Sequence, residues 1–127
     1  MVKLDKDFWL ALRREMFDDN FDGGWFLEEW VEAAAEKLDS LNIESVKIVY
    51  CEIEENLNPY HMWVKYKDSS TSREMIADGS AGIFDKSYPL GFYGTIDSVI
   101  GRLHEIYSSG EEVQEMKKKG LLNRIYG

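Results

Sequence analysis

The apolar positions in the first third of the chain follow the period of amphipathic helices. Residues 4–17 form a short helical pattern, which the polar, glycine-containing stretch 18–24 interrupts. Residues 25–41 form the clearest helical pattern of the chain, with Leu27, Val31, Ala34, Leu38 and Leu41 on one face and Glu28, Glu32, Glu36 and Asp39 on the other. We interpret the acidic face as solvated surface, with a docking surface as the alternative.

Further along the chain, the helical period gives way to alternation. Residues 46–54 alternate between two faces and predict a strand, and residues 56–59 predict a loop. Residues 61–67 and 73–79 flank a polar turn at 68–71, which is typical of an antiparallel hairpin. Residues 79–94, rich in Gly and aromatic side chains, predict an ordered loop.

Two helices are predicted after this loop. Thr95 can cap a helix whose apolar face contains Ile96, Val99, Leu103 and Tyr107. Ser109 and Glu112 resemble a capping box that starts a last helix, ending near residue 119. This order predicts an α+β fold in which N-terminal helices pack on a small antiparallel sheet and C-terminal helices follow. The length predicts a single domain over residues 1–127.

Charge and cysteine content narrow the classes of function. The formal net charge of −9 argues against direct binding to nucleic-acid phosphates and is compatible with a basic protein partner. The single cysteine, Cys51, excludes a disulfide within the chain and a zinc cluster of cysteine type. The sequence has no apolar run of membrane-spanning length and no signal-peptide core. We therefore predict a cytoplasmic protein that binds neither membrane nor metal and needs no cofactor.

The hairpin brings together two residues with catalytic potential. If its strands pair symmetrically about the turn, His61 faces Asp78, Trp63 faces Ile76 and Lys65 faces Glu74. On the other face, Met62 would meet Ala77, Val64 would meet Met75 and Tyr66 would meet Arg73. In this register Asp78 accepts a hydrogen bond from the His61 ring and fixes its tautomer, as a Cys–His site requires of its base and orienting residue. The alternative is a cross-strand pair that only steadies the hairpin.

The motifs His61-Met-Trp-Val and Asp78-Gly79, after an upstream helix, resemble the papain-like and transglutaminase-like cysteine hydrolase superfamily. The resemblance covers about residues 20–85. It implies that His61 is the general base, that Asp78 orients it, and that the nucleophile stands at the start of helix 25–41. Trp25 or Phe26 occupies that position, and no Ser, Thr or Cys lies between Asp18 and Asp39. The resemblance therefore implies a pseudo-enzyme that has lost its nucleophile.

Cys51 is the remaining thiol, and the strand pattern places it in the middle of strand 46–54. We expect it to be a small buried side chain. It would serve as a nucleophile only if that strand assignment were wrong. His104 is expected at the boundary of a helix, and the two His residues form no metal-binding motif.

Three functions remain open. The first is a non-catalytic inhibitory protein that presents acidic and aromatic surface to a basic partner, as in phage-encoded antagonists of host nucleic-acid-binding proteins. The second is an active cysteine hydrolase or transferase that uses His61, Asp78 and Cys51. The third is a small-molecule binding module built on the aromatic loop 83–93. The residues expected to bind a partner are Trp25, Glu28, Glu32, Glu36, Phe84, Tyr88, Phe92 and Tyr93.

Overall fold

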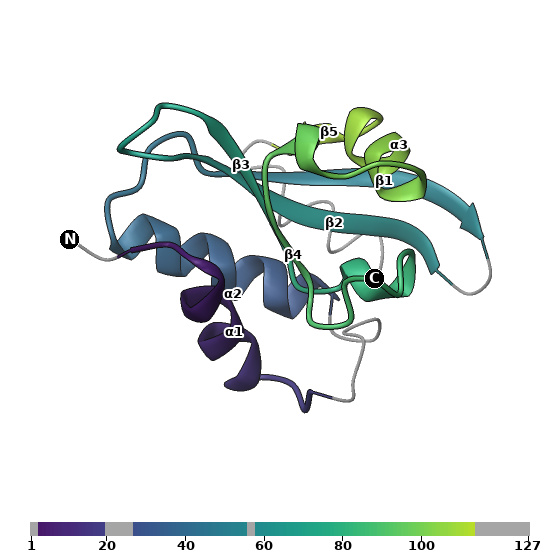
Figure 1. The fold of residues 1–127 in the computed structure, drawn as a ribbon, viewed down its shortest axis with the longest axis horizontal. Coiled ribbons are helices and arrows are strands. Elements are labelled where there is room, and N and C mark those ends of the chain that lie inside the picture. Colours follow the sequence, from purple (N-terminus) through teal and green to yellow (C-terminus); the bar gives the residue numbers. More distant parts are fainter. Residues whose placement is uncertain (1–2, 20–26, 56–57, 114–127) are drawn as a thin grey trace.

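The computed structural model describes residues 3–19, 27–55 and 58–113, and it confirms the predicted α+β fold (Figure 1). Two helices precede a five-stranded antiparallel sheet, and a third helix lies between its last two strands. The helices are α1 (Lys6–Arg14), α2 (Leu27–Ser40) and α3 (Arg102–Ser108). The strands are β1 (Lys47–Glu55), β2 (Asn58–Lys67), β3 (Glu74–Asp78), β4 (Phe92–Gly94) and β5 (Glu111–Val113). Short 3-10 turns, η2 (Ala81–Ile83) and η3 (Ile96–Ser98), flank β4.

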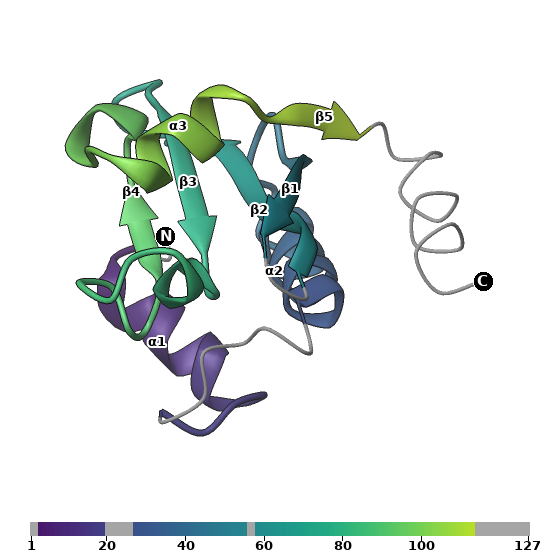
Figure 2. The same cartoon turned by 90° about the vertical axis from the view of Figure 1, so that its right-hand side faces the viewer.

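The strand order β4-β3-β2-β1-β5 puts the two three-residue strands at opposite edges of the sheet. β1, β2 and β3 follow one another in the chain and pair as neighbours. The chain then leaves β4, crosses one face of the sheet through η3 and α3, and returns as β5 beside β1 (Figure 2). The segment between β4 and β5 therefore spans the sheet from edge to edge.

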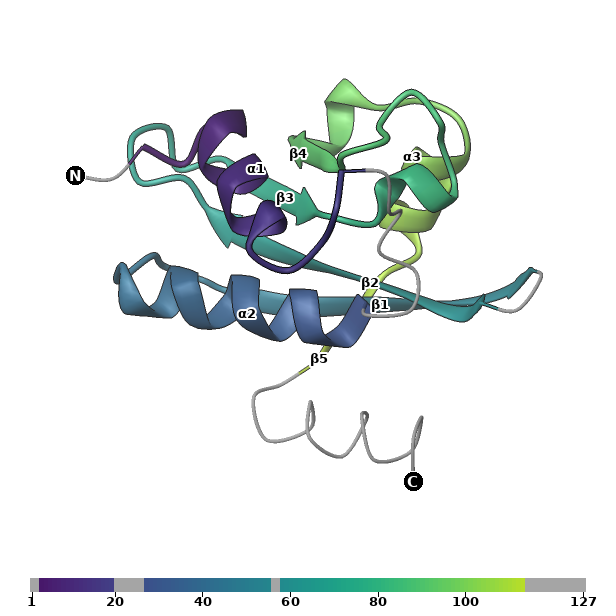
Figure 3. The same cartoon turned by 90° about the horizontal axis from the view of Figure 1, so that it is seen from below.

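Each face of the sheet carries its own apolar core. We call them the α2 face and the α3 face. On the α2 face, α1 and α2 pack against side chains that include Met62, Val64 and Tyr66 (Figures 1 and 3). On the α3 face, α3 and the segment 81–99 pack against side chains that include Val49 and Trp63. Because side chains alternate along a strand, His61 shares the α3 face with Trp63.

Two contacts hold the end of β3 against the helices of the α2 face. The buried Arg13 of α1 donates a hydrogen bond from Nε to the carbonyl oxygen of Gly79, at 2.9 Å. A Cβ atom at Gly79 would lie 2.7 Å from the Trp30 ring of α2, so a side chain does not fit there. Gly79 therefore lets β3 approach both helices, directly after Asp78.

Several predicted element boundaries were wrong in the C-terminal third. The predicted loop 79–94 contains η2 and β4. Thr95 precedes only the short turn η3, and α3 begins after Gly101, whose φ of 73° interrupts the helix. The predicted helix from Ser109 is wrong over Glu111–Val113, which form β5, and its remainder lies outside the described residues. Residues 111–113 extend because they pair with β1.

Candidate functional site

His61 and Asp78 are in contact on the α3 face. His61 Nε2 lies 2.6 Å from Asp78 Oδ2, and both side chains are fully buried. The predicted hydrogen bond is present, but the predicted register is wrong by two residues: Val64 pairs with Ala77 and Lys65 with Ile76. A register shift of two residues keeps every side chain on the same face of the sheet. His61 therefore contacts Asp78 as a diagonal neighbour on the adjacent strand. The roles of base and orienting residue stay predictions.

Asp78 accepts hydrogen bonds from three separate elements. Besides His61 on β2, the Tyr107 hydroxyl of α3 donates to Oδ2 at 2.6 Å, and the backbone N–H of Ser80 donates to Oδ1 at 3.0 Å. Burial raises the pKa of Tyr107, and the charge and hydrogen bond of Asp78 raise it further. Since a carboxylate only accepts hydrogen bonds, His61 Nε2 is the donor in its contact with Asp78.

The His61 ring is enclosed by aromatic side chains. Phe84 packs edge-on with its ring centroid 4.8 Å away, and the Trp63 ring lies at 5.8 Å. His61 Nδ1 is buried and has no hydrogen-bond partner within the described part of the chain. A buried polar atom without a partner carries a free-energy penalty, and such atoms are uncommon in folded proteins.

Cys51 lies directly opposite His61 on the neighbouring strand β1. The strand assignment is correct, and the pairing of β1 with β2 itself places Cys51 opposite His61. The expectation that Cys51 would serve as a nucleophile only under another assignment stays a prediction. The thiol is half-buried, and its Sγ lies 3.5 Å from the carbonyl oxygen of Glu52, to which it donates. Burial raises the pKa of the Cys51 thiol, the positive charge of Arg102 lowers it, and the charges of Glu111 and Glu52 raise it.

Cys51 opens onto a cavity of about 270 Å³ between β1 and the start of β5. The Tyr50 hydroxyl donates a hydrogen bond to Glu111 Oε2 at 2.9 Å within it. Glu111 pairs with Tyr50 and Glu52 pairs with Tyr60, so strand alternation places both carboxylates on the α2 face, opposite to the side chain of Cys51. The lining of the cavity consists of Tyr50, Cys51, Glu52, Ser109 and Glu111.

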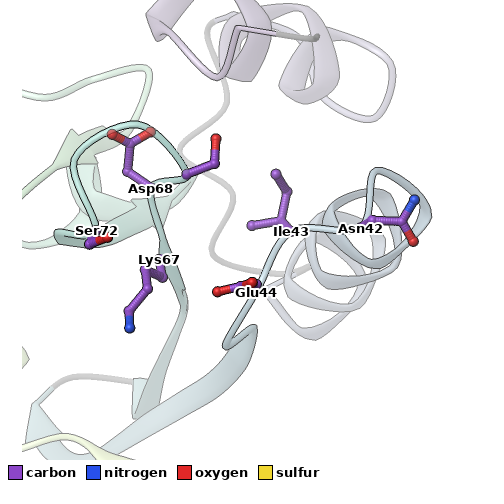
Figure 4. Close-up of a pocket in the computed structure, with 7 residues that line it drawn as sticks. Asn42, Ile43, Glu44, Lys67, Asp68 and Ser72 are labelled. Carbon is purple, nitrogen blue, oxygen red and sulfur yellow. The ribbon is translucent and has the colours of Figure 1, made fainter.

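A second, smaller cavity of about 140 Å³ lies at the other end of β2, where the β2–β3 turn meets the end of α2 (Figure 4). Asn42 and Ser72 in its wall adopt left-handed backbone conformations, with φ of 59° and 60°. The Asp68 carboxylate there accepts hydrogen bonds from Ser70 and Thr71 of its own turn. These contacts close the hairpin, and the cavity is separate from the His61 pair.

The residues predicted to bind a partner are scattered. Glu28 and Phe92 are 8% and 6% exposed, so the prediction that they are surface residues is wrong. Tyr93 is half-buried, and its ring stacks on Trp9 with centroids 5.8 Å apart. Phe84, Tyr88 and Glu32 are half-buried, and Glu36 is exposed. Trp25 lies outside the described residues.

The helix that resembles the nucleophile helix of cysteine hydrolases lies on the α2 face, whereas His61 and Asp78 lie on the α3 face. This departs from an arrangement in which the helix aims a thiol at the His. Residues 25 and 26, at the nucleophile position, lie outside the described ranges. The chain matches no protein-family model, no curated protein and no solved structure. The superfamily assignment therefore stays a prediction.

Two further properties concern ligands and membranes. Over the ranges 3–19, 27–55 and 58–113, no three His, Cys, Asp or Glu side chains are grouped so that they could hold a metal ion. In the same ranges, no helix has the length and apolar character that crossing a membrane requires.

Proposed function

We propose that this protein is a non-catalytic binding protein that presents the outer side of α2 to a basic protein partner. The observation that carries the proposal is the exposure of Glu29, Glu36 and Asp39 on this helix, with Glu32 half-buried beside them. Lys37 is the only basic residue of the helix. Together with the net charge of −9, this row of carboxylates would attract a positively charged groove.

The class of partner is inferred from the spacing of the carboxylates along α2. Grooves that bind nucleic acids present Lys and Arg side chains to a row of phosphates. A helix with carboxylates on successive turns offers such a groove a comparable row of negative charges. We therefore propose a cytoplasmic nucleic-acid-binding protein as the partner and inhibition by occupation of its groove as the mode of action.

Matched charge variants test this proposal. Glu36→Gln with Asp39→Asn removes two carboxylates from α2, and Asp7→Asn with Asp97→Asn removes two exposed carboxylates elsewhere. We expect the α2 pair to weaken binding to a panel of purified basic nucleic-acid-binding proteins by about tenfold or more, whereas the control pair changes it little. DNA should compete with the protein for its partner. Equal weakening by both pairs, or binding indifferent to DNA, would contradict the proposal.

A second candidate, an active cysteine hydrolase or transferase, is favoured by one observation: Cys51 lies opposite a buried His whose Nδ1 has no partner among the described residues. This version predicts labelling of Cys51 by an electrophilic thiol probe at neutral pH, with loss of labelling in His61→Ala. The small-molecule module has less support, since Phe84 packs on His61 and Tyr88 packs on Phe92, at 5.4 Å between ring centroids.

A further inference from the structure

The outer edge of β1 is covered along only part of its length. β1 pairs with β2 over Lys47–Glu55, whereas on its other side β5 pairs with residues 48–50. Within the described part of the chain, no strand lies beside β1 from Cys51 onward, and this end of β1 extends past the helices and β5 (Figures 1 and 3). An uncovered edge presents backbone N–H and C=O groups with which a further strand can pair. The register of β1 with β2 shifts between Glu52 and Glu55, so the regular part of the open edge is short.

The cavity beside β1 lies where the chain turns away from this edge. Gly110 precedes β5 and packs over the α3 face, where a Cβ atom would lie 2.5 Å from Cγ1 of Val49. The chain therefore crosses the α3 face after α3 and reaches the edge of β1 only at Glu111. The space left beside Cys51 and Glu52 is the cavity of about 270 Å³. The open edge thus has room next to it.

The side chains along the open edge differ between the two faces of the sheet. Glu52 is exposed and projects on the α2 face, because Tyr50, two residues earlier, packs on that face. Cys51 and Ile53 belong to the core of the α3 face. Glu111 pairs with Tyr50, so its carboxylate lies on the same face as Glu52 and two positions along the edge. The edge therefore offers carboxylates on one face and apolar side chains on the other.

We propose that the open edge of β1 around Glu52 binds an extended segment of a protein partner by strand addition, and that this segment carries a Lys or Arg between two apolar residues. The basic side chain would lie opposite Glu52 and near Glu111, where it meets two carboxylates. The apolar side chains would extend the core that contains Cys51 and Ile53. β4 and β5 show that pairings of three residues occur at both edges of this sheet.

A second copy of this chain fits the edge poorly. Two copies that paired through β1 with their faces aligned would bring the Glu52 carboxylates of both copies to the same face and close together. Like charges opposite one another destabilise a pair of strands, and charged edge residues are one means by which proteins avoid pairing with their own kind. A basic segment instead gains from the local carboxylates and from the net charge of −9.

The experiment uses the full-length protein and short synthetic peptides. The probe is acetylated and amidated Val-Lys-Val-Lys-Val, and the control peptide has glutamate in place of each lysine. In NMR titrations we expect the lysine peptide to bind about tenfold or more tightly than the glutamate peptide. Bound lysine peptide should slow amide hydrogen exchange at residues 51–53. It should also slow alkylation of Cys51, the only thiol of the chain.

A modified peptide separates strand addition from attraction between charges. The lysine peptide with every backbone amide N-methylated keeps its positive charges but has no N–H to donate to β1. We expect it to bind about tenfold or more weakly than the unmodified peptide, because main-chain hydrogen bonds supply much of the affinity in strand addition.

Matched charge reversals separate the edge from the rest of the surface. Glu52→Lys should weaken binding of the lysine peptide by about tenfold or more and strengthen binding of the glutamate peptide. Glu36→Lys makes the same change of charge at an exposed position of α2 and should alter both affinities little. Because the edge of β1 and the outer side of α2 use different residues, Glu36→Gln with Asp39→Asn should leave peptide binding unchanged. Failure of one proposal is therefore distinguishable from failure of the other.

Four results would overturn the proposal. They are no binding of the lysine peptide at about 1 mM, equal affinities of the lysine and glutamate peptides, undiminished binding of the N-methylated peptide, and equal effects of Glu52→Lys and Glu36→Lys. Binding that leaves hydrogen exchange at residues 51–53 unchanged would also place the peptide elsewhere and contradict strand addition at β1.

Discussion

Tyr107 and His61 contact the same atom: each lies 2.6 Å from Oδ2 of Asp78. One buried oxygen therefore connects α3 to β2 and β3. The other carboxylate oxygen accepts from the backbone at Ser80, which fixes the orientation of the group. The two side chains depend on one another through Asp78, because losing either donor leaves part of a buried charge unsatisfied.

Removing the hydroxyl of Tyr107 should destabilise the protein. Tyr107→Phe deletes one hydrogen bond to a buried carboxylate, and we expect the free energy of unfolding to fall by about 1.5–3 kcal/mol. The measurement is urea denaturation at pH 7. Tyr50→Phe is the matched control, because its hydroxyl bonds Glu111 at an exposed position and should cost less than about 1 kcal/mol. Equal losses of unfolding free energy in the two variants would show that the buried hydrogen bond from Tyr107 to Asp78 contributes no more than the exposed one.

Tyr107 should also make the protein sensitive to alkali. Its pKa is raised in the folded state, chiefly by burial, whereas a tyrosine of the unfolded chain ionises near pH 10, at about the reference value. The unfolded chain then loses a proton that the folded protein keeps. Stability from this group is full below about pH 10 and is lost as pH rises above it. Unfolding measured between pH 8 and 11 should show a smaller loss in Tyr107→Phe, and an unchanged slope would count against the contact.

Asp68 should contribute to the loss of stability at acidic pH. Hydrogen bonds from the side chains of Thr71 and Ser70 lower the pKa of its carboxyl, so the stability that it contributes is present above about pH 4, near the unfolded reference value, and is lost as pH falls through the lower folded value. Asp68→Asn should flatten the fall in stability between pH 5 and 2. Thr71→Val, which removes the first of these donors, should flatten it in part. A steeper fall in Asp68→Asn would contradict the assignment.

Gly79 should not tolerate a side chain. Gly79→Ala would place Cβ 2.7 Å from the Trp30 ring, and we expect a loss of about 1–3 kcal/mol from overpacking. Gly101→Ala separates steric from conformational effects, because its Cβ would meet nothing within 4 Å while its φ is 73°. That variant should lose about 1–3 kcal/mol from backbone strain alone. Thermal unfolding compares the two, and a Gly79→Ala protein as stable as wild type would refute the close packing.

The register of the β2–β3 hairpin shows what the sequence could predict. Alternation fixed the face of each side chain, and a shift of two residues preserves that face, so the contact of His61 with Asp78 was predictable. The turn geometry was not. The N–H of Asp68 donates to the Arg73 carbonyl, and Ser72 adopts a φ of 60°, which makes the turn longer than the symmetric one expected.

Cys51 and Tyr107 lie near the His61–Asp78 pair but were not predicted there, and their sequence signals differ. The position of Cys51 opposite His61 follows from pairing β1 and β2 as consecutive antiparallel strands. Tyr107 sits among apolar residues of α3, and a buried tyrosine hydroxyl usually finds a partner, although the sequence does not name which one. The apparent capping box misled for a local reason: Ser109 Oγ donates to the Glu105 carbonyl at the end of α3, and Glu112 pairs with Lys65 at 3.0 Å.

The stacking of Trp9 on Tyr93 has a consequence for synthesis of the chain. α1 leaves the ribosome before the sheet does, but one ring that covers its fully buried Trp9 belongs to β4, which follows β1, β2 and β3. Until β4 has been synthesised, part of the apolar side chain of Trp9 in α1 stays exposed. A growing chain that stops before Tyr93 would therefore leave part of Trp9 exposed, and transiently exposed apolar surface makes such chains prone to aggregation.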